Sequence, residues 1–163
     1  MKIRIDFLKS QSDQKKPVLE LIKQIQQQAN TDPAAMQLFK LIIRGLEFVE
    51  RHGMPLVKQL YLTTEREDGR PYTIQIVKEL RHHVPLMEFR INWAGAGAFR
   101  SVFFEYQVDD LQLLLFVTAV VKQTTTSADF ENIVQEAESV YSDFLKNPEQ
   151  YINLTGVDTH EKR

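Results

Sequence analysis

Three strand-like apolar stretches follow one another in the second half of the chain, and they constrain the fold more than any other feature. They are Met87 to Trp93, Phe99 to Gln107 and Leu111 to Val121. The connections between them, Ala94 to Ala98 and Asp109-Asp110, have the length and composition of tight turns. Strands joined by tight turns pair antiparallel, so these residues predict an antiparallel meander.

Before the meander, the hydrophobic pattern predicts one strand and two helices. Residues 2–8 alternate polar and apolar side chains, as a half-buried strand does. Pro17 opens a helix whose apolar residues recur every three or four positions up to Ala29. Asp32-Pro33 then caps and begins a second helix, and its apolar stripe continues to Gly53. Two adjacent amphipathic helices predict a helical hairpin.

Further extended pieces and a last helix complete the expected elements. Leu56 to Leu62 and Tyr72 to Leu80 have an extended pattern, and a turn-rich segment separates them. Ser127 or Asp129 caps a helix whose apolar residues recur at helical intervals until Asn147-Pro148.

The order of the elements predicts an α+β fold. An N-terminal strand and a helical hairpin pack on a curved antiparallel sheet, with the helices on one face, and a C-terminal helix closes the chain. No linker rich in proline, glycine or serine divides the sequence. We therefore expect a single domain over residues 1–146 and a flexible tail over residues 147–163.

Composition excludes several classes of protein. The 163 residues are 43% hydrophobic and 26% charged, which is typical of one globular domain. Cysteine is absent, which excludes disulfides, thiolate zinc sites and a cysteine nucleophile. The longest apolar runs, such as Leu113 to Val117, fall far short of the roughly 20 residues that span a bilayer. We expect a cytoplasmic protein without a membrane partner.

Charge is unevenly distributed although the net charge is only −2. The chain is mildly basic up to Tyr106 and acidic after Asp129. This distribution permits RNA contact by the middle of the chain, whereas the sequence pI of about 6.1 weighs against a generic polyanion binder.

Two motifs with possible chemistry are too incomplete to use. Gly95 and Gly97 give half of a dinucleotide fingerprint and lie between strands, which favours a hairpin turn. His82 and His83 are adjacent and lack the spacing of metal ligands on a helix. We expect no cofactor and no metal.

Basic residues on consecutive predicted strands are the feature that stands out. They are Lys78, Arg81, Arg90, Arg100 and Lys122. On a sheet with its helices on one side, the open face would gather these side chains into a cationic concavity suited to phosphate. The alternative is a solvated sheet face, which also collects lysine and arginine and needs no ligand.

Four segments together carry a resemblance to a known family. They are ELRHHVPLMEFRI (79–91), AFRSVFFEY (98–106), LLLFVTAVVKQTTTS (113–127) and EAESVYSDFL (136–145). In order and spacing they resemble the RelE/ParE superfamily of toxins from toxin–antitoxin systems, in particular its HigB-like, phage-derived branch. The resemblance implies a ribosome-dependent mRNA endoribonuclease that a cognate antitoxin neutralises. In such enzymes the ribose 2′-hydroxyl attacks the adjacent phosphate, and lysine and arginine stabilise the developing charge.

Carried over residue by residue, the resemblance assigns phosphate binding and transition-state charge to Arg90 and Arg100. Lys78 matches the lysine of the preceding segment and joins them as a catalytic candidate. Lys122 matches the first lysine of a Phe-x-Lys-Lys-Thr stretch and, with the weaker neighbour Arg81, is expected to bind RNA. The general base stays open among four residues, which are His82, His83, Glu88 and Tyr106.

The chain also departs from the family pattern. Gln123, Thr126, Ala128 and Val140 stand where related toxins carry a second lysine, a basic residue, a proline and often an arginine. The loss of positive charge weakens attraction to RNA. It leaves open a catalytically inactive relative that acts as a protein-binding regulatory module, and, less favoured, a ParE-like inhibitor of gyrase.

Overall fold

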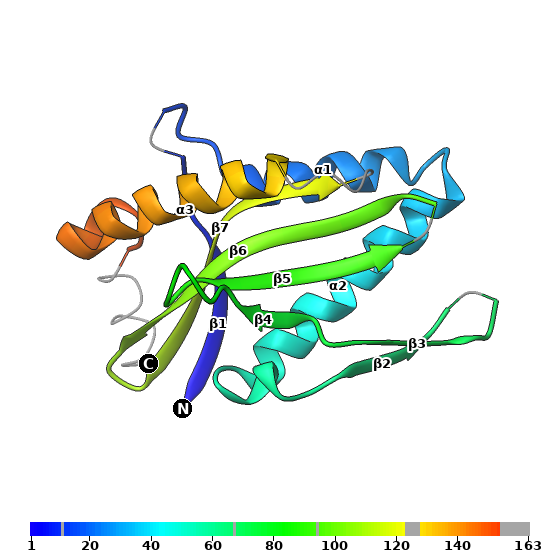
Figure 1. The fold of residues 1–163 in the computed structure, drawn as a ribbon, viewed down its shortest axis with the longest axis horizontal. Coiled ribbons are helices and arrows are strands. Elements are labelled where there is room, and N and C mark those ends of the chain that lie inside the picture. The colour runs from blue at the N-terminus through cyan, green and yellow to red at the C-terminus, as the bar shows by residue number, and fades with distance from the viewer. Residues whose placement is uncertain (11, 67, 94, 123–127, 154–163) are drawn as a thin grey trace.

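The computed structural model describes residues 1–10, 12–66, 68–93, 95–122 and 128–153 (Figure 1). Within these residues the chain forms an α+β fold. The strands are β1 (Lys2–Phe7), β2 (Leu62–Glu65), β3 (Pro71–Ile74), β4 (Val77–Glu79), β5 (Met87–Trp93), β6 (Gly97–Val108) and β7 (Leu111–Lys122). The α-helices are α1 (Pro17–Gln28), α2 (Pro33–His52) and α3 (Ala128–Lys146), and two 3-10 turns are η1 (Leu56–Lys58) and η2 (Pro148–Gln150).

The main sheet has the strand order β1-β7-β6-β5-β4. The predicted meander is confirmed, since β5, β6 and β7 pair antiparallel in sequence order. β1, however, pairs parallel with β7, so the sheet is mixed and not antiparallel throughout. Alternation of side chains predicts a strand but not its direction. β1 and its partner β7 are not consecutive, and the long stretch of chain between them permits parallel pairing.

Helices cover both faces of the sheet, which corrects the expectation that they lie on one face. α1 and α2 pack on the face that carries Phe89, Phe103 and Phe116. α3 packs on the opposite face, over β6 and β7 (Figure 1). The centre of the sheet is therefore buried on both sides, which is why Leu113 to Val117 is a continuous apolar run.

The helical hairpin forms as predicted. Pro17 is the first residue of α1, and the carboxylate of Asp32 accepts a 3.0 Å hydrogen bond from the Ala34 N–H at the start of α2. α2 ends at His52, and the next residue, Gly53, has a φ of 68°, which favours glycine. These local signals position α2 across the sheet, where Gly45 faces Phe89 of β5.

The segment between α2 and β5 differs from the sequence prediction. Leu56–Lys58 forms a 3-10 turn and not a strand, and the run from Tyr72 to Leu80 divides into β3 and β4. β2 and β3 form a separate two-stranded sheet that projects from the main body (Figure 1). The hydroxyl of Tyr72 fixes this hairpin to β5, since it donates to the Asn92 C=O and accepts from the Asn92 N–H, at 2.9 and 3.1 Å.

The C-terminal segment begins with packed residues, which corrects the prediction of a flexible tail from residue 147. η2 follows α3 directly, and the Tyr151 hydroxyl donates a 2.8 Å hydrogen bond to the Asp143 carboxylate. Ile152 is buried against the α3 side of the sheet. A single isoleucine in a polar run is too weak a pattern to predict from sequence that this segment packs against the sheet. Ser127, one of the two predicted caps of α3, lies outside the described residues, as does the rest of the predicted tail.

Within the described residues, no helix is both long and apolar enough to cross a membrane.

Candidate functional site

The basic side chains of the predicted strands share one face of the sheet. Glu88 and Arg90 alternate along β5 with Phe89 and Ile91, which contact α2 on the other face. Cross-strand pairing extends this face to the neighbouring strands, because directly opposite residues have the same orientation. Lys78 of β4 lies opposite Glu88, Arg100 of β6 lies opposite Arg90, and Lys122 of β7 lies opposite Ala98.

We call this surface the cationic face and define it by Lys78, Glu88, Arg90, Arg100 and Lys122. It is the α3 side of the sheet, because the ring of Phe130 in α3 covers Arg100. α3 packs mainly over β6 and β7, so the part of the face on β4 and β5 lies beside the helix and not beneath it (Figure 1). Four cations share this face with one carboxylate.

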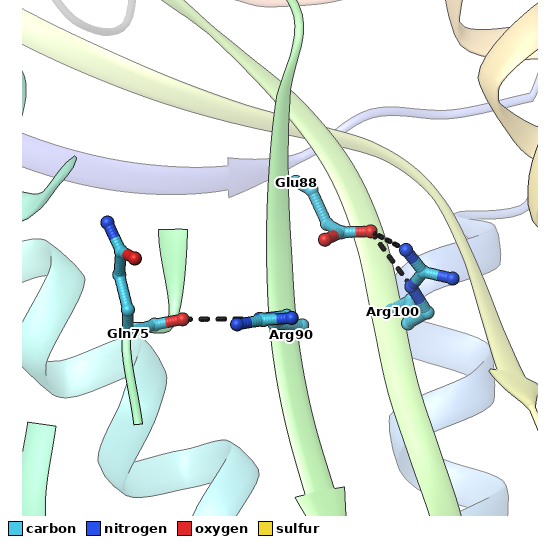
Figure 2. A network of polar contacts seen from close by, with 4 residues as sticks. All are labelled: Gln75, Glu88, Arg90 and Arg100. Atoms are coloured by element: carbon cyan, nitrogen blue, oxygen red, sulfur yellow. Dashed lines mark hydrogen bonds and ion pairs between the residues drawn. The ribbon is translucent and has the colours of Figure 1, made fainter. Parts of the chain in front are cut away.

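Arg100 is the cation of this face whose charge is already paired with a carboxylate. Its Nε donates to Oε2 of Glu88 at 2.8 Å, and Nη2 donates to the same oxygen (Figure 2). Its guanidinium carbon lies 3.7 Å from the centre of the Phe130 ring. The Glu88 side chain is only 4% exposed, against 22% for Arg100. A carboxylate this buried requires a cationic partner, so Arg100 neutralises Glu88 and anchors α3 to the sheet.

Arg90 is in a different environment, although it lies directly opposite Arg100. Its Nε donates a 3.3 Å hydrogen bond to the Gln75 C=O (Figure 2). Within the described residues its guanidinium has no ion pair, and its two terminal nitrogens have no hydrogen bond. Arg90 and Arg100 carry like charges on directly opposite residues, which repel each other. Glu88 pairs with Arg100 but not with Arg90. Arg90 therefore keeps a half-exposed positive charge and donors for a bidentate contact.

A hollow of about 530 Å³ adjoins the cationic face at the edge strand β4. Its polar lining combines three cations, one carboxylate and two amides, from Lys58, Lys78, Arg81, Glu79, Gln59 and Gln75. Glu79 pairs with Lys58 at 2.5 Å, whereas Lys78 and Arg81 have no ion pair within the described part of the chain. Gln75 joins the hollow to the cationic face, because its backbone C=O accepts from Arg90 and its side-chain amide donates to the Lys58 C=O.

The structure therefore brings together most of the residues singled out from sequence. Lys78, Arg90, Arg100 and Lys122 share the cationic face, and Arg81 lines the adjoining hollow. Sequence reasoning did not find Lys58 and Gln75. Lys58 reaches the hollow from the turn after α2, and Gln75 acts through its backbone oxygen, so neither carries a periodic or motif signal.

The four candidates for a general base lie in separate places. Glu88 is paired with Arg100, and Nδ1 of His83 hydrogen-bonds to the Glu138 carboxylate of α3. His82 is exposed in the connection between β4 and β5. Tyr106 packs edge-on against Phe144, on the half of β6 that extends beyond β5. Glu88 is thus the only one of the four on the cationic face.

Tyr72 lies near Arg90, and it is the titratable group among the described residues whose pKa is shifted from its ordinary value. Burial raises the pKa of Tyr72 above its ordinary value, and the hydrogen bond from Asn92 and the charge of Arg90 lower it in part. The phenol is therefore a neutral hydrogen-bonding group at physiological pH, and its role is to hold the β2–β3 hairpin against β5.

Comparisons with protein-family models, with curated proteins and with solved structures found no match for this chain. The resemblance to the RelE/ParE superfamily therefore rests on the order and spacing of the four sequence segments. Chemically, the arrangement offers a guanidinium with unpaired donors, two flanking lysines and an adjoining cationic hollow. Such a surface is suited to bind successive phosphates of an extended polyanion.

Proposed function

We propose that this protein binds the phosphate backbone of RNA on the cationic face. The observation that carries the proposal is the environment of Arg90, which keeps unpaired donors and stands between Lys78 and Lys122 on a part of the sheet beside α3. An extended chain of phosphates would follow the face from Lys122 past Arg90 into the hollow at Lys78 and Arg81. The acidic residues of α3 border this path and would restrict where RNA can lie.

The resemblance of the four segments supports a more specific proposal. The chain has a RelE-like fold and is the toxin of a toxin–antitoxin pair, which cleaves mRNA on the ribosome in the cytoplasm and is neutralised by a cognate antitoxin. Arg90 and Lys78 would then stabilise the charge that develops when the ribose 2′-hydroxyl attacks the adjacent phosphate. The attack forms a cyclic 2′,3′-phosphate and releases the 5′-hydroxyl of the next nucleotide.

Controlled expression with mapping of mRNA 5′ ends tests the proposal. The wild-type chain is expected to arrest growth and to produce new 5′ ends that depend on translation. Arg90→Ala should remove both effects. Lys23→Ala is the matched control, because Lys23 is an exposed cation on α1, on the other side of the sheet, and should act as the wild type does.

The structure also decides which arginine to change. Arg100→Ala would leave the buried Glu88 carboxylate without its partner, so a loss of activity would report on folding. Arg90→Ala removes a charge with no buried partner. A folded Arg90→Ala variant that still arrests growth and cleaves mRNA would contradict the assigned site.

The engagement of Arg100 favours a second candidate function. One of the two best-matched basic residues is neutralised by Glu88 and covered by Phe130, as expected of a scaffold that binds without cleaving. In that case the protein is a regulatory module on the same fold. It would bind RNA through Arg90 without producing new 5′ ends or arresting growth.

A further inference from the structure

The strand β1 forms one edge of the main sheet, and half of its backbone groups point outward. The Lys2 N–H donates to the carbonyl of Asp110, just before β7, and the Leu8 N–H donates to the Phe116 carbonyl of β7. Because successive residues of a strand point their backbone groups to opposite sides, those of Ile3, Ile5 and Phe7 face the open edge. Such an edge is a template for a further strand.

Two carboxylates occupy this edge in the isolated chain. Glu50 of α2 accepts a 3.2 Å hydrogen bond from the Ile5 N–H, and Asp6 accepts a 2.9 Å hydrogen bond from the Phe7 N–H. Both contacts are made by exposed or half-buried side chains, which can rotate away. The edge is thus protected by replaceable groups and not by a buried element.

An apolar groove of about 230 Å³ runs along the same edge. It lies between β1 and the outer side of α2, and it is lined by Ile5, Phe7, Ile43, Leu46, Glu47 and Glu50. A strand added to β1 would place alternate side chains in this groove, because they would continue the face of Ile5 and Phe7. The groove therefore requires an occupant with apolar side chains at every second position.

We propose that the occupant is β1 of a second copy of this chain, paired antiparallel about a twofold axis at Ile5. In this register Ile5 lies opposite Ile5 of the other copy, and Ile3 lies opposite Phe7. All of these residues have outward backbone groups, so they form the hydrogen-bonded pairs of an antiparallel ladder. Their side chains enter the two symmetry-related grooves, one on each copy.

Charge selects this register. Arg4 then lies opposite Asp6 of the other copy, twice by symmetry, in the non-hydrogen-bonded pairs where side chains approach most closely. Arg4 has no ion pair within the described residues. A slip of the second copy by two residues in one direction places Arg4 opposite Arg4, and a slip in the other direction places Asp6 opposite Asp6. Both alternatives put like charges face to face.

The pairing also accounts for the two carboxylates that protect the edge. The Ile5 N–H would donate to the Ile5 carbonyl of the other copy and release Glu50. The Phe7 N–H would donate to the Ile3 carbonyl and free Asp6 to pair with Arg4. Glu50 and Glu47 would then approach their symmetry mates near the axis, so Glu50→Gln is expected to strengthen the association.

Charge reversal tests the proposal through the oligomeric state, measured by sedimentation over a concentration series. The wild-type chain is expected to dimerise. Arg4→Asp and Asp6→Arg should each raise the dissociation constant about tenfold or more, because each places like charges opposite one another. The double variant Arg4→Asp/Asp6→Arg restores opposite charges and should dimerise as the wild type does. A wild-type chain that remains monomeric, or single variants that dimerise unchanged, would overturn the proposal.

A cysteine test reads the register without depending on those variants. The chain has no cysteine, so Ile5→Cys introduces a single thiol. Across the proposed axis the two Cα atoms would lie about 5.5 Å apart, which a disulfide can bridge. Oxidation should give a covalent dimer. Ile3→Cys is the matched control, because its symmetry mate would lie about 13 Å away along the strand. Equal cross-linking of the two variants, or none at position 5, would contradict the register.

Discussion

Arg90 and Arg100 are identical side chains on directly opposite positions, yet their partners give them different chemistry. Glu88 and Phe130 surround the Arg100 side chain, while the Arg90 side chain makes one hydrogen bond among the described residues, to the Gln75 carbonyl. A sequence gives no sign of this difference, because it arises from which residue of β5 lies beside each arginine and from the placement of α3. The choice of Arg90 as the central site residue therefore depends on the cross-strand register.

The Glu88–Arg100 pair is expected to matter for stability because it is buried. Glu88→Ala leaves Arg100 without its carboxylate and should lower the free energy of unfolding by about 3 kcal/mol. Glu79→Ala is the matched control, since Glu79 also pairs with a cation but its side chain is 53% exposed, and its loss should cost less than about 1 kcal/mol. Urea denaturation measures both. Equal losses in the two variants would contradict a buried, mutually dependent pair.

Tyr72 should make stability depend on alkaline pH. Burial raises the pKa of its phenol in the folded protein, so above the ordinary pKa of about 10 the unfolded chain binds fewer protons than the folded one. Stability should therefore fall as the pH rises through that range. Tyr72→Phe should make this fall shallower, whereas Tyr61→Phe, at an exposed tyrosine, should not. The measurement is the free energy of unfolding from about pH 9 to 11. Parallel curves for Tyr72→Phe and the wild type would refute the assignment.

At the scale of elements, the contact between α2 and β5 sets the height of the helix above the sheet. Gly45 is a point of close approach, since a Cβ atom there would lie 2.9 Å from Cζ of Phe89 and 3.1 Å from Cδ1 of Ile91. Both of those side chains are fully buried, which leaves them little room to move aside. The helix therefore carries a glycine in its interior despite the cost in helix propensity.

Gly45→Ala is accordingly expected to destabilise the protein. Alanine favours a helix by about 1 kcal/mol over glycine, but overpacking a buried contact costs typically about 1 to 3 kcal/mol. We expect a net loss that separates α2 from β5 slightly. Thermal unfolding checks the sign. An increase in the unfolding temperature would mean that α2 does not pack this closely.

Most elements were predictable from local patterns, and their mutual arrangement was less so. The turns between β5, β6 and β7, the caps of α2 and the period of α3 are all local signals, and each placed its element correctly. The division of residues 72–80 into β3 and β4, the parallel direction of β1 and the placement of α3 depend on distant contacts. Periodicity within a segment contains no information about those contacts.

For the candidate site too, local patterns predicted one part of the arrangement, and distant contacts decided the rest. Alternation along the strands was enough to predict that Lys78, Arg90, Arg100 and Lys122 share a face. The expected open face is only half open, because α3 covers part of it. The engagement of Arg100 and the contribution of Lys58 to the hollow could not be predicted. They depend on a buried carboxylate and on a turn that lies far away in sequence.

At the scale of the whole molecule, charge is separated across the α3 side of the sheet. Lys78 and Arg90 of the cationic face and the hollow lie on β4 and β5, while the exposed acidic residues of α3 lie over β6 and β7. A polyanion would be guided to one side of this surface and repelled from the other. The proposed RNA binding is therefore compatible with a net charge of −2, because it needs only the local positive charge of this surface.

The salt dependence of RNA binding by the purified protein tests this account most directly. We predict that a single-stranded RNA binds with an affinity that falls as salt rises, and that Arg90→Ala reduces the slope of that dependence by about 0.7 for each phosphate that Arg90 neutralises in the wild type. Lys23→Ala, on the opposite side of the sheet, should keep the wild-type slope. Equal slopes for Arg90→Ala and the wild type, or a folded protein that bound no RNA at low salt, would contradict RNA binding by the cationic face.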